Sequence, residues 1–346
     1  MNPPASEPEE APAPRMTDVL FGHADSEAAL LAAYRGGRIP HAFLLMGPKG
    51  IGKATLAYRM ARFVLAHPDP ADPAVQAATS LAVDPGHPVA RRMAVQAQGD
   101  LLIIERTPNE KGILRQQIAV EHVRRTVSFF GATAGEGGWR IAIVDAVDEL
   151  NRSGANALLK VLEEPPQRAL LLLVCHSAAR VPATLRSRCR VMTLRPLAQT
   201  EVAAALAAAV GHASGDPQIK AAAAAAAAEG SVGRALAFLD EGALALRQRS
   251  LDQLDRLPAL DSNALHGLGD ALAGTDPQPL AAFVDTINAW LSQRLDRNQT
   301  EIARMARLAE AWERINQAAR DAETYNLERK PLVFSVFGLL AEATRG

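Results

Sequence analysis

Cysteine is scarce in this sequence: Cys175 and Cys189 are the only two among 346 residues, and they do not form a Cys-x-x-Cys pair. This scarcity excludes a disulfide framework and a four-cysteine zinc site, and it favours the cytoplasm. The sequence also lacks an apolar run of the about 20 residues that cross a bilayer, so we expect no membrane span. The net charge of −1 excludes the globally basic character of a protein that binds duplex DNA alone.

The remaining composition is that of a soluble globular protein, with 48% hydrophobic and 22% charged residues. Its length allows two or three domains. Residues 1–16 are rich in proline, alanine and glutamate and have neither the basic start nor the apolar core of a signal peptide. We therefore predict a disordered leader over residues 1–16.

A degenerate phosphate-binding loop follows the apolar run that ends at Met46. The pattern G-x-x-x-x-G-K-[ST] is matched by Gly47, Gly52 and Lys53, with Gly50 between them, but its last position is Ala54. In an intact loop, backbone N–H groups surround the phosphates, the lysine contacts them, and the hydroxyl binds Mg²⁺. Alanine cannot bind a metal, and the adjacent Thr55 is rotated by about 100° around the helix.

A second nucleotide motif has the same kind of defect. The apolar segment Ile141–Val144 predicts a buried strand that ends in Asp145, a carboxylate placed to approach Mg²⁺. ATPases of this fold class normally continue with a glutamate that polarises the attacking water, whereas this chain has Ala146. Two independent defects thus indicate weak or absent hydrolysis.

Strand patterns alternate with helix patterns up to residue 195, which predicts an α/β core with a parallel sheet. Beyond Pro196 only helical patterns occur. We predict a phosphate-loop core over residues 17–195, a small helical lid over 196–258 and an all-helical C-terminal domain over 259–346.

A third set of motifs points to a family. The segments 156–166, Asn-Ala-Leu-Leu-Lys-Val-Leu-Glu-Glu-Pro-Pro, and 181–189, which ends in Ser187-Arg188-Cys189, follow the two nucleotide motifs in order. From about Val19 to Leu239 the chain resembles the bacterial clamp loaders of the AAA+ class. Intact Ser-Arg-Cys beside a failed nucleotide site is most similar to the delta prime subunits of DNA polymerase III. The motor subunits gamma and tau carry Lys-Thr and Asp-Glu instead.

The resemblance implies roles for individual residues. Arg188 would act in trans, as an arginine finger in the ATP site of a neighbouring subunit, with Ser187 and Cys189 as turn and packing residues. His176 occupies the position that is normally a polar γ-phosphate sensor, but a histidine there favours a loop residue, with the sensor as the alternative. Arg234 belongs to a second sensor motif, Gly230–Arg234, but is displaced by one position. Residues 66–92, where many relatives bind zinc through four cysteines, contain none, so we expect no zinc or other metal.

The implied function is that of a clamp-loader stator, which works with gamma/tau motor subunits, a delta subunit, the sliding clamp and primer-template DNA. ATP or ADP binding by Lys53 and the glycine loop stays open. One alternative is an ATP-hydrolysing motor in which Thr55 binds Mg²⁺ and Asp148 or Glu149 replaces the missing glutamate. Another is a binding-only adaptor for replication or repair, which would be indifferent to the loss of Arg188.

Overall fold

The chain forms two compact units, residues 1–236 and 237–346, in a computed structural model. The structure describes residues 13–108, 115, 117–131, 138–210, 216–274, 276–297 and 302–345. Of the predicted leader, residues 1–12 lie outside this range. Its end is structured: the short 3-10 helix η1 (Pro14–Met16) is attached to the core because Arg62 Nη2 donates to the Arg15 carbonyl at 2.7 Å.

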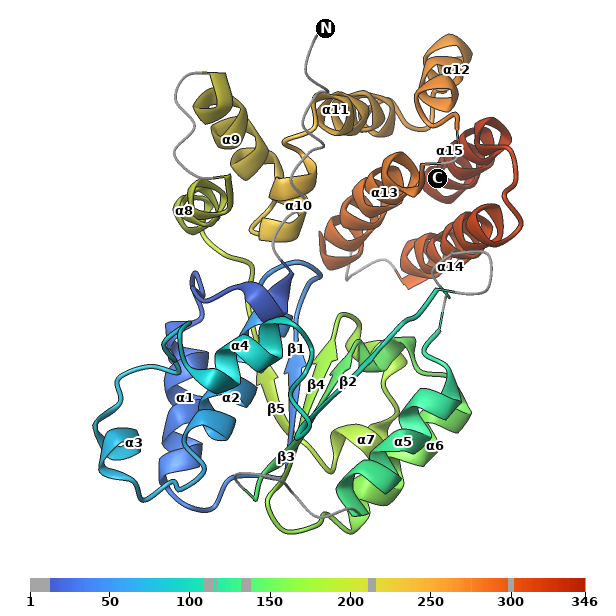
Figure 1. Cartoon of the computed structure of the whole chain (residues 1–346). Coiled ribbons are helices and arrows are strands. Elements are labelled where there is room, and N and C mark those ends of the chain that lie inside the picture. Colours follow the sequence, from blue (N-terminus) through green and yellow to red (C-terminus); the bar gives the residue numbers. More distant parts are fainter. Residues whose placement is uncertain are drawn as a thin grey trace, which may run out of the picture. The chain divides into compact units, whose positions relative to one another are not determined.

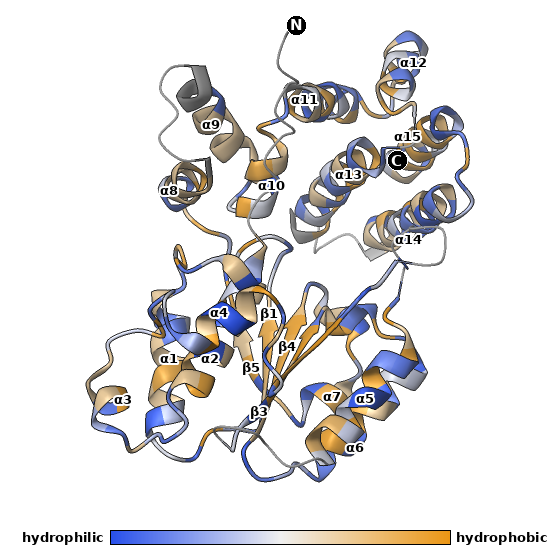
Figure 2. Ribbon diagram, in the orientation of Figure 1, coloured by the Kyte–Doolittle hydropathy of each residue, from blue (hydrophilic) through white to orange (hydrophobic). Residues whose placement is uncertain are grey.

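The first unit is built on a five-stranded, fully parallel sheet with the order β2-β3-β4-β1-β5 (Figure 1). The strands are β1 (Ala42–Met46), β2 (Leu101–Glu105), β3 (Arg140–Asp145), β4 (Ala169–Cys175) and β5 (Arg190–Thr193). Every residue of the central strand β4 is buried, which explains its unbroken apolar sequence: both faces of a parallel sheet are covered by helices. In Figure 2 the central strands are accordingly the most hydrophobic part of this unit.

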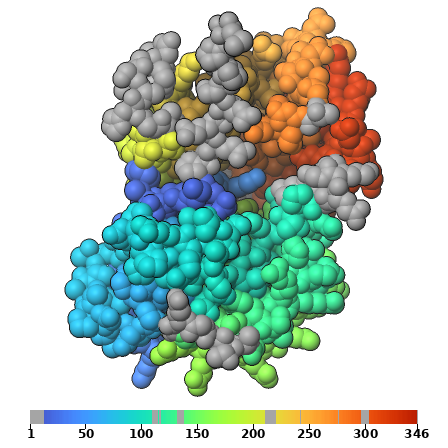
Figure 3. Space-filling view, viewed as in Figure 1, coloured from blue at the N-terminus to red at the C-terminus, as the bar shows by residue number. Residues whose placement is uncertain are grey.

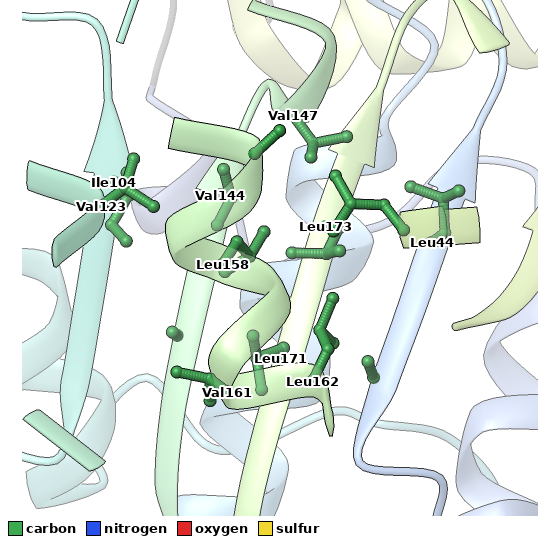
Figure 4. Packing of buried hydrophobic residues seen from close by; sticks show 14 of the residues in the cluster. Leu44, Ile104, Val123, Val144, Val147, Leu158, Val161, Leu162, Leu171 and Leu173 are labelled. Atoms are coloured by element: carbon green, nitrogen blue, oxygen red, sulfur yellow. The ribbon is translucent and has the colours of Figure 1, made fainter. Parts of the chain in front are cut away.

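Helices α5 (Val120–Gly131) and α6 (Arg152–Glu163) pack together and cover one face of the sheet. Leu158 of α6 lies beside Val144 of β3 and Leu171 of β4, and Leu44 of β1 belongs to the same buried cluster (Figure 4). Apolar side chains that recur every second residue along the strands thus pack against apolar side chains that recur about every 3.6 residues along α6. Helices α1 (Ala24–Arg35) and α2 (Lys53–Ala66) pack together, and α2 contacts β1, β3 and β4.

The segment between α2 and β2, in which we predict no zinc, contains two short helices, α3 (Pro73–Ala77) and α4 (Pro88–Ala94). Its side chains cover part of the face of the first unit shown in Figure 3. Among the described residues, no group of three or more His, Cys, Asp or Glu side chains is placed to hold a metal ion. Three short elements complete the core: η2 (Val147–Glu149), η3 (Ala178–Arg180) and α7 (Ala183–Arg186).

The helical segment after β5 contains α8 (Gln199–Val210), α9 (Asp216–Ala227) and α10 (Val232–Ala237). Gly230 connects this segment to the linker after β5, because the Leu197 N–H donates to its carbonyl at 3.0 Å. Gly230 has φ +78°, and a Cβ there would lie 2.6 Å from the Leu197 carbonyl oxygen. Only glycine fits this position without strain.

The second unit is entirely helical in its described residues. Its helices are α11 (Glu241–Asp255), α12 (Ser262–Ala271), α13 (Pro277–Arg297), α14 (Ile302–Thr324) and α15 (Arg329–Thr344). Leu246 and Leu254 of α11 belong to the same buried cluster as Phe283 of α13 and Phe337 of α15. The sequence placed the boundary of the C-terminal domain at residue 259, but α11 packs its apolar face with the later helices, so the compact unit begins at residue 237.

The predicted fold class is confirmed: an α/β core with a parallel sheet is followed by helical lid and C-terminal segments. Over the part of the chain that the structure describes, we find no helix with both the length and the hydropathy of a membrane span.

Candidate functional site

The sequence-predicted nucleotide residues meet at the carboxyl edge of the sheet. In the parallel register, Met46 at the end of β1 lies opposite Cys175 at the end of β4, and Asp145 of β3 lies opposite Val174. The residues that follow these strands therefore share one edge, which is where ligands bind in open α/β sheets. The structure brings together the glycine loop after β1, Asp145 and His176.

Lys53, the lysine of the phosphate loop, is turned back onto its own loop. Its side chain is buried, with the residue 2% exposed, and Nζ donates to the carbonyls of Gly47 at 2.7 Å and Pro48 at 2.5 Å. Burial lowers the pKa of this amine to about 8, an effect that the nearby Asp145 and Asp148 carboxylates partly offset. The group that should contact a phosphate thus has backbone partners within the loop.

The middle of the loop is bonded to the lid segment. The Ser231 hydroxyl donates to the Lys49 carbonyl at 2.9 Å, and the Gly233 N–H donates to the Gly50 carbonyl at 2.9 Å. Gly50 has φ +77°, and a Cβ there would lie 2.5 Å from Ser231 Oγ. A Cβ on Gly233 would in turn lie 3.0 Å from the Gly50 Cα. Two glycines therefore allow the two backbones to approach each other directly.

The end of the loop is bonded to the segment before α1. His23 Nε2 lies 2.7 Å from the Ile51 carbonyl, and because a carbonyl only accepts, this nitrogen carries the proton. Together with the Lys53, Ser231 and Gly233 bonds, this means that five successive carbonyls, from residue 47 to residue 51, accept a hydrogen bond from protein groups. The shape of the loop is thus maintained without a ligand.

The acidic residues of this edge have different surroundings. Burial raises the pKa of Asp145, and Ala146, in the place of a catalytic glutamate, is itself buried. Asp148 accepts from the backbone N–H of His176 at 2.8 Å and from that of Ser177 at 3.1 Å. Both carboxylate oxygens of Asp148 are therefore used to fix the turn after β4.

Glu149, the other acid that could replace the missing glutamate, forms an ion pair of 2.8 Å with Arg106. Burial raises the pKa of Glu149, and the adjacent arginine opposes that effect. Asp148 and Glu149 thus both have protein partners in this fold.

The two sensor candidates also differ. Burial, aided by the Lys53 charge, lowers the pKa of His176 to about 4, so the ring is neutral near pH 7. Its Nδ1 is buried and has no hydrogen-bond partner among the described residues. The Arg234 guanidinium forms an ion pair with Glu229 at 3.1 Å, and the backbone N–H of Arg234 donates to Ser231 Oγ at 3.2 Å.

The Ser-Arg-Cys motif lies between α7 and β5. Arg188 is only partly exposed: its Nη2 lies 2.8 Å from Glu163 Oε1, and its Nη1 donates to the Thr184 carbonyl at 3.0 Å. Ser187 donates to the same carbonyl at 3.1 Å and belongs to the turn. Cys189 packs against the sheet core, and burial raises its thiol pKa to about 11, so the thiol is protonated near pH 7.

Comparison with known proteins assigns the chain to a family. A family model described as "DNA polymerase III, delta subunit" matches residues 22–198, about half of the chain. The chain belongs to this family. The match covers β1, the degenerate loop, Asp145 and the Ser-Arg-Cys motif, so the resemblance to clamp-loader subunits that these motifs indicate is confirmed.

Individual relatives match only part of their length. The "DNA polymerase III subunit delta'" of Pseudomonas aeruginosa is 35% identical over 156 residues, which is 44% of this chain and 43% of that protein. The tau/gamma subunit of Haemophilus influenzae is 28% identical over 180 residues, 52% of this chain and 24% of that protein. A solved DNA polymerase III gamma subunit-related protein from Thermotoga maritima, 14% identical, has a TM-score of 0.41 over 94% of this chain and all of that one.

The sequence did not reveal the part played by His23, Ser231 or Glu163. Ser231 and Gly233 belong to the motif Gly230–Arg234, in which Arg234 was the predicted functional residue. The two small residues, however, make the contact with the loop. The available signal was the pair Gly230 and Gly233, since glycine can mark a close approach of two backbones. His23 and Glu163 carried no signal, because their partners are distant in the sequence.

Proposed function

We propose that this chain is a clamp-loader subunit that does not hydrolyse ATP itself and that contributes Arg188 to an ATP site on a neighbouring motor subunit. The observation that carries the proposal is the contrast between Arg188, which is partly exposed and oriented, and a phosphate loop whose five carbonyls are bonded to the protein's own groups.

The chemistry of the finger is electrostatic. A guanidinium placed against a γ-phosphate neutralises the charge that develops in the transition state, and such fingers raise rates by about 10³–10⁵-fold. Arg188 has this capacity because its charge is permanent and its planar group suits phosphate oxygens. Glu163 and the Thr184 carbonyl restrict its orientation before a partner arrives.

The residues of the chain's own nucleotide site favour a subunit that does not hydrolyse ATP over a motor subunit. Ala54 removes the hydroxyl that binds Mg²⁺, Ala146 removes the catalytic acid, and Asp148 is occupied by two backbone N–H groups. ATP or ADP binding to the loop would require Lys53 to exchange its carbonyl partners for phosphate. We therefore propose a stator without turnover of its own.

The partners follow from the family. Relatives named delta' and tau/gamma belong to DNA polymerase III. We propose that this chain assembles with gamma/tau motor subunits and a delta subunit, with the helices of residues 237–346 in a shared collar. The assembled complex would load the sliding clamp onto primer-template DNA, in the cytoplasm.

The test is ATP hydrolysis by a complex reconstituted with the gamma/tau and delta subunits of the same organism, stimulated by clamp and primed DNA. Arg188→Ala is compared with the natural chain after size-exclusion chromatography has established equal assembly. Arg124→Ala, an exposed arginine on α5, serves as the matched control. We expect a large loss of turnover for Arg188→Ala alone. Unchanged turnover would eliminate the finger and favour a binding-only adaptor.

A second candidate, a gamma/tau-like motor, is favoured by the 28% identity to a tau/gamma subunit. It predicts ATP turnover by the isolated chain that disappears in Lys53→Ala. The stator predicts that the isolated chain and Lys53→Ala both stay at the background rate.

A further inference from the structure

Strand β2 has a free edge. It lies at the end of the sheet and pairs only with β3. The Ile141 N–H donates to the Asp100 carbonyl, so in the parallel register the backbone groups of Leu102 and Ile104 are directed toward β3. Those of Ile103 are directed away from the sheet, and they form no hydrogen bond with a described residue. The edge therefore offers an N–H and a C=O to a further strand.

A hollow lies beside this edge, on the α2 side of the sheet. Leu101 and Ile103 share this face because side chains alternate along a strand. The two side chains line the hollow together with Arg15, Tyr58, Met93 and Gln98. A strand added beside β2 would turn every second side chain to the same face, so one of its side chains would meet the hollow.

The rim of the hollow is apolar and basic. Arg15 and Gln96 border it, and their neighbours Met16 and Val95 are 55% and 74% exposed. Elements η1 and α4 are in contact, and Arg15 Nε donates to the Ala94 carbonyl at 3.4 Å, which brings the two exposed side chains to one surface. Arg15 forms no ion pair with a described carboxylate, so its charge is available to a carboxylate of a partner.

We propose that the free edge of β2 and the adjacent hollow form a docking site for an extended, acidic segment of a partner protein. The segment adds as a strand through main-chain hydrogen bonds to Ile103. One of its aliphatic side chains fills the hollow, and a carboxylate two residues away, on the same face, pairs with Arg15. In strand addition the main-chain bonds supply affinity, and pockets for alternate side chains supply specificity.

The free edge decides the class of partner. A nucleic acid could pair its phosphates with Arg15, but it has no peptide groups to extend the β-ladder and no aliphatic side chain for the hollow. The docking site uses neither Arg188 nor the phosphate loop, so it does not depend on the proposed function.

The test is the fluorescence anisotropy of a short fluorescein-labelled peptide titrated with the full-length chain. The peptide repeats valine, threonine, glutamate and threonine, so that valine and glutamate share one face of the extended peptide. Two further versions carry N-methyl groups on every second amide, in one phase or in the other. Only one phase faces β2 in a strand pair, so we expect one version to bind at least about tenfold more weakly and the other to bind normally.

Two variants of the chain test the contacts. Ile103→Pro removes the outward N–H and leaves the bonds to β3, since an edge strand accepts proline on its free side. It should weaken binding at least about fivefold. Arg15→Gln should weaken binding about fivefold and make it indifferent to replacing the peptide's glutamates by glutamine. Arg124→Gln, an exposed arginine on α5, is the matched control and should bind normally.

Circular dichroism and thermal unfolding establish that the variants are folded, and the two N-methylated peptides decide if Ile103→Pro is not. Absent binding, equal loss with both N-methylated peptides, or normal binding by both Ile103→Pro and Arg15→Gln would overturn the proposal. So would binding that appears only after removal of residues 1–12, because the chain's own N-terminal segment would then be the occupant. Primed DNA that binds more weakly to Arg15→Gln, without binding of the peptide, would identify a nucleic-acid surface instead.

Discussion

Arg188 and Glu163 form an ion pair of 2.8 Å that joins the Ser-Arg-Cys turn to the last residue of α6. The pair is solvent-accessible, with side chains 36% and 50% exposed. An exposed pair contributes only about 0–1 kcal/mol to stability, so its effect is orientation: it limits the directions in which the guanidinium can point. The two motif segments that identify the family are thus in direct contact.

Replacing Glu163 by Gln should lower the ATP turnover of the reconstituted complex by at most about fivefold, the equivalent of about 1 kcal/mol. Its stability should stay within about 0.5 kcal/mol of the natural chain. The neighbouring exposed Glu164→Gln is the matched control and should have no effect. A loss as large as that of Arg188→Ala would contradict a positioning role, and so would equal losses in the two glutamate variants. The measurement is the steady-state kcat and KM for ATP of the complex reconstituted with each glutamate variant.

The contact between the loop and the lid segment predicts unequal costs for two glycines. Gly37 and Gly50 both have positive φ, but a Cβ on Gly37 meets nothing within 4 Å, whereas one on Gly50 meets Ser231 Oγ at 2.5 Å. Gly37→Ala should therefore cost only the left-handed backbone penalty of about 1–2 kcal/mol. Gly50→Ala should cost at least about 1 kcal/mol more, because it also overpacks a buried contact.

Urea unfolding of the first unit measures this difference. Trp139 is the tryptophan of that unit, so replacing Trp290 and Trp312 by Phe makes its fluorescence report on the first unit alone. Equal costs for the two glycine variants would show that the lid segment does not contact Gly50 in solution.

Lys53 should destabilise the protein at neutral pH. Its pKa falls from 10.5 to about 8 on folding, so the unfolded chain binds the proton more tightly and stability rises as the pH increases from 8 to 10.5. Below pH 8 the full cost is present, on the order of 3 kcal/mol. Lys53→Met should accordingly be more stable than the natural chain at pH 7, and the advantage should shrink above pH 8. Lower stability of Lys53→Met at pH 7 would mean that the bonds to Gly47 and Pro48 outweigh desolvation.

Asp148 should be structural rather than catalytic. Asp148→Asn leaves one oxygen for the two N–H groups of His176 and Ser177, and we expect a loss of about 1–3 kcal/mol in unfolding free energy. Asp25→Asn, an exposed acid on α1, should change stability by less than about 0.5 kcal/mol. The motor hypothesis would be supported if the isolated natural chain hydrolysed ATP and the Asp148→Asn variant did not. Thermal unfolding and a turnover assay on the same preparations give both results.

The fold class and the residue types of the site could be predicted from the amino-acid sequence. Buried parallel strands require unbroken apolar runs, and these are visible at β1, β3 and β4 because both faces are covered. The positions of Ala54 and Ala146 also follow from sequence alone, since a missing hydroxyl or carboxylate is a matter of residue type. Lid and C-terminal helices were predictable from their periodicity, but their division at residue 237 was not, because α11 is assigned by what its apolar face contacts.

The partners of these residues became visible only in the folded chain. His23, Ser231 and Gly233 reach the loop from segments far apart in the sequence, and no local pattern records such a hydrogen bond. The same holds for Asp148, whose carboxylate is available in the sequence but occupied in the fold. Glu163 and Arg188 are 25 residues apart, and their contact exists because α6 ends where the turn after α7 begins. Residue type follows from sequence, whereas burial and partners depend on distance in space.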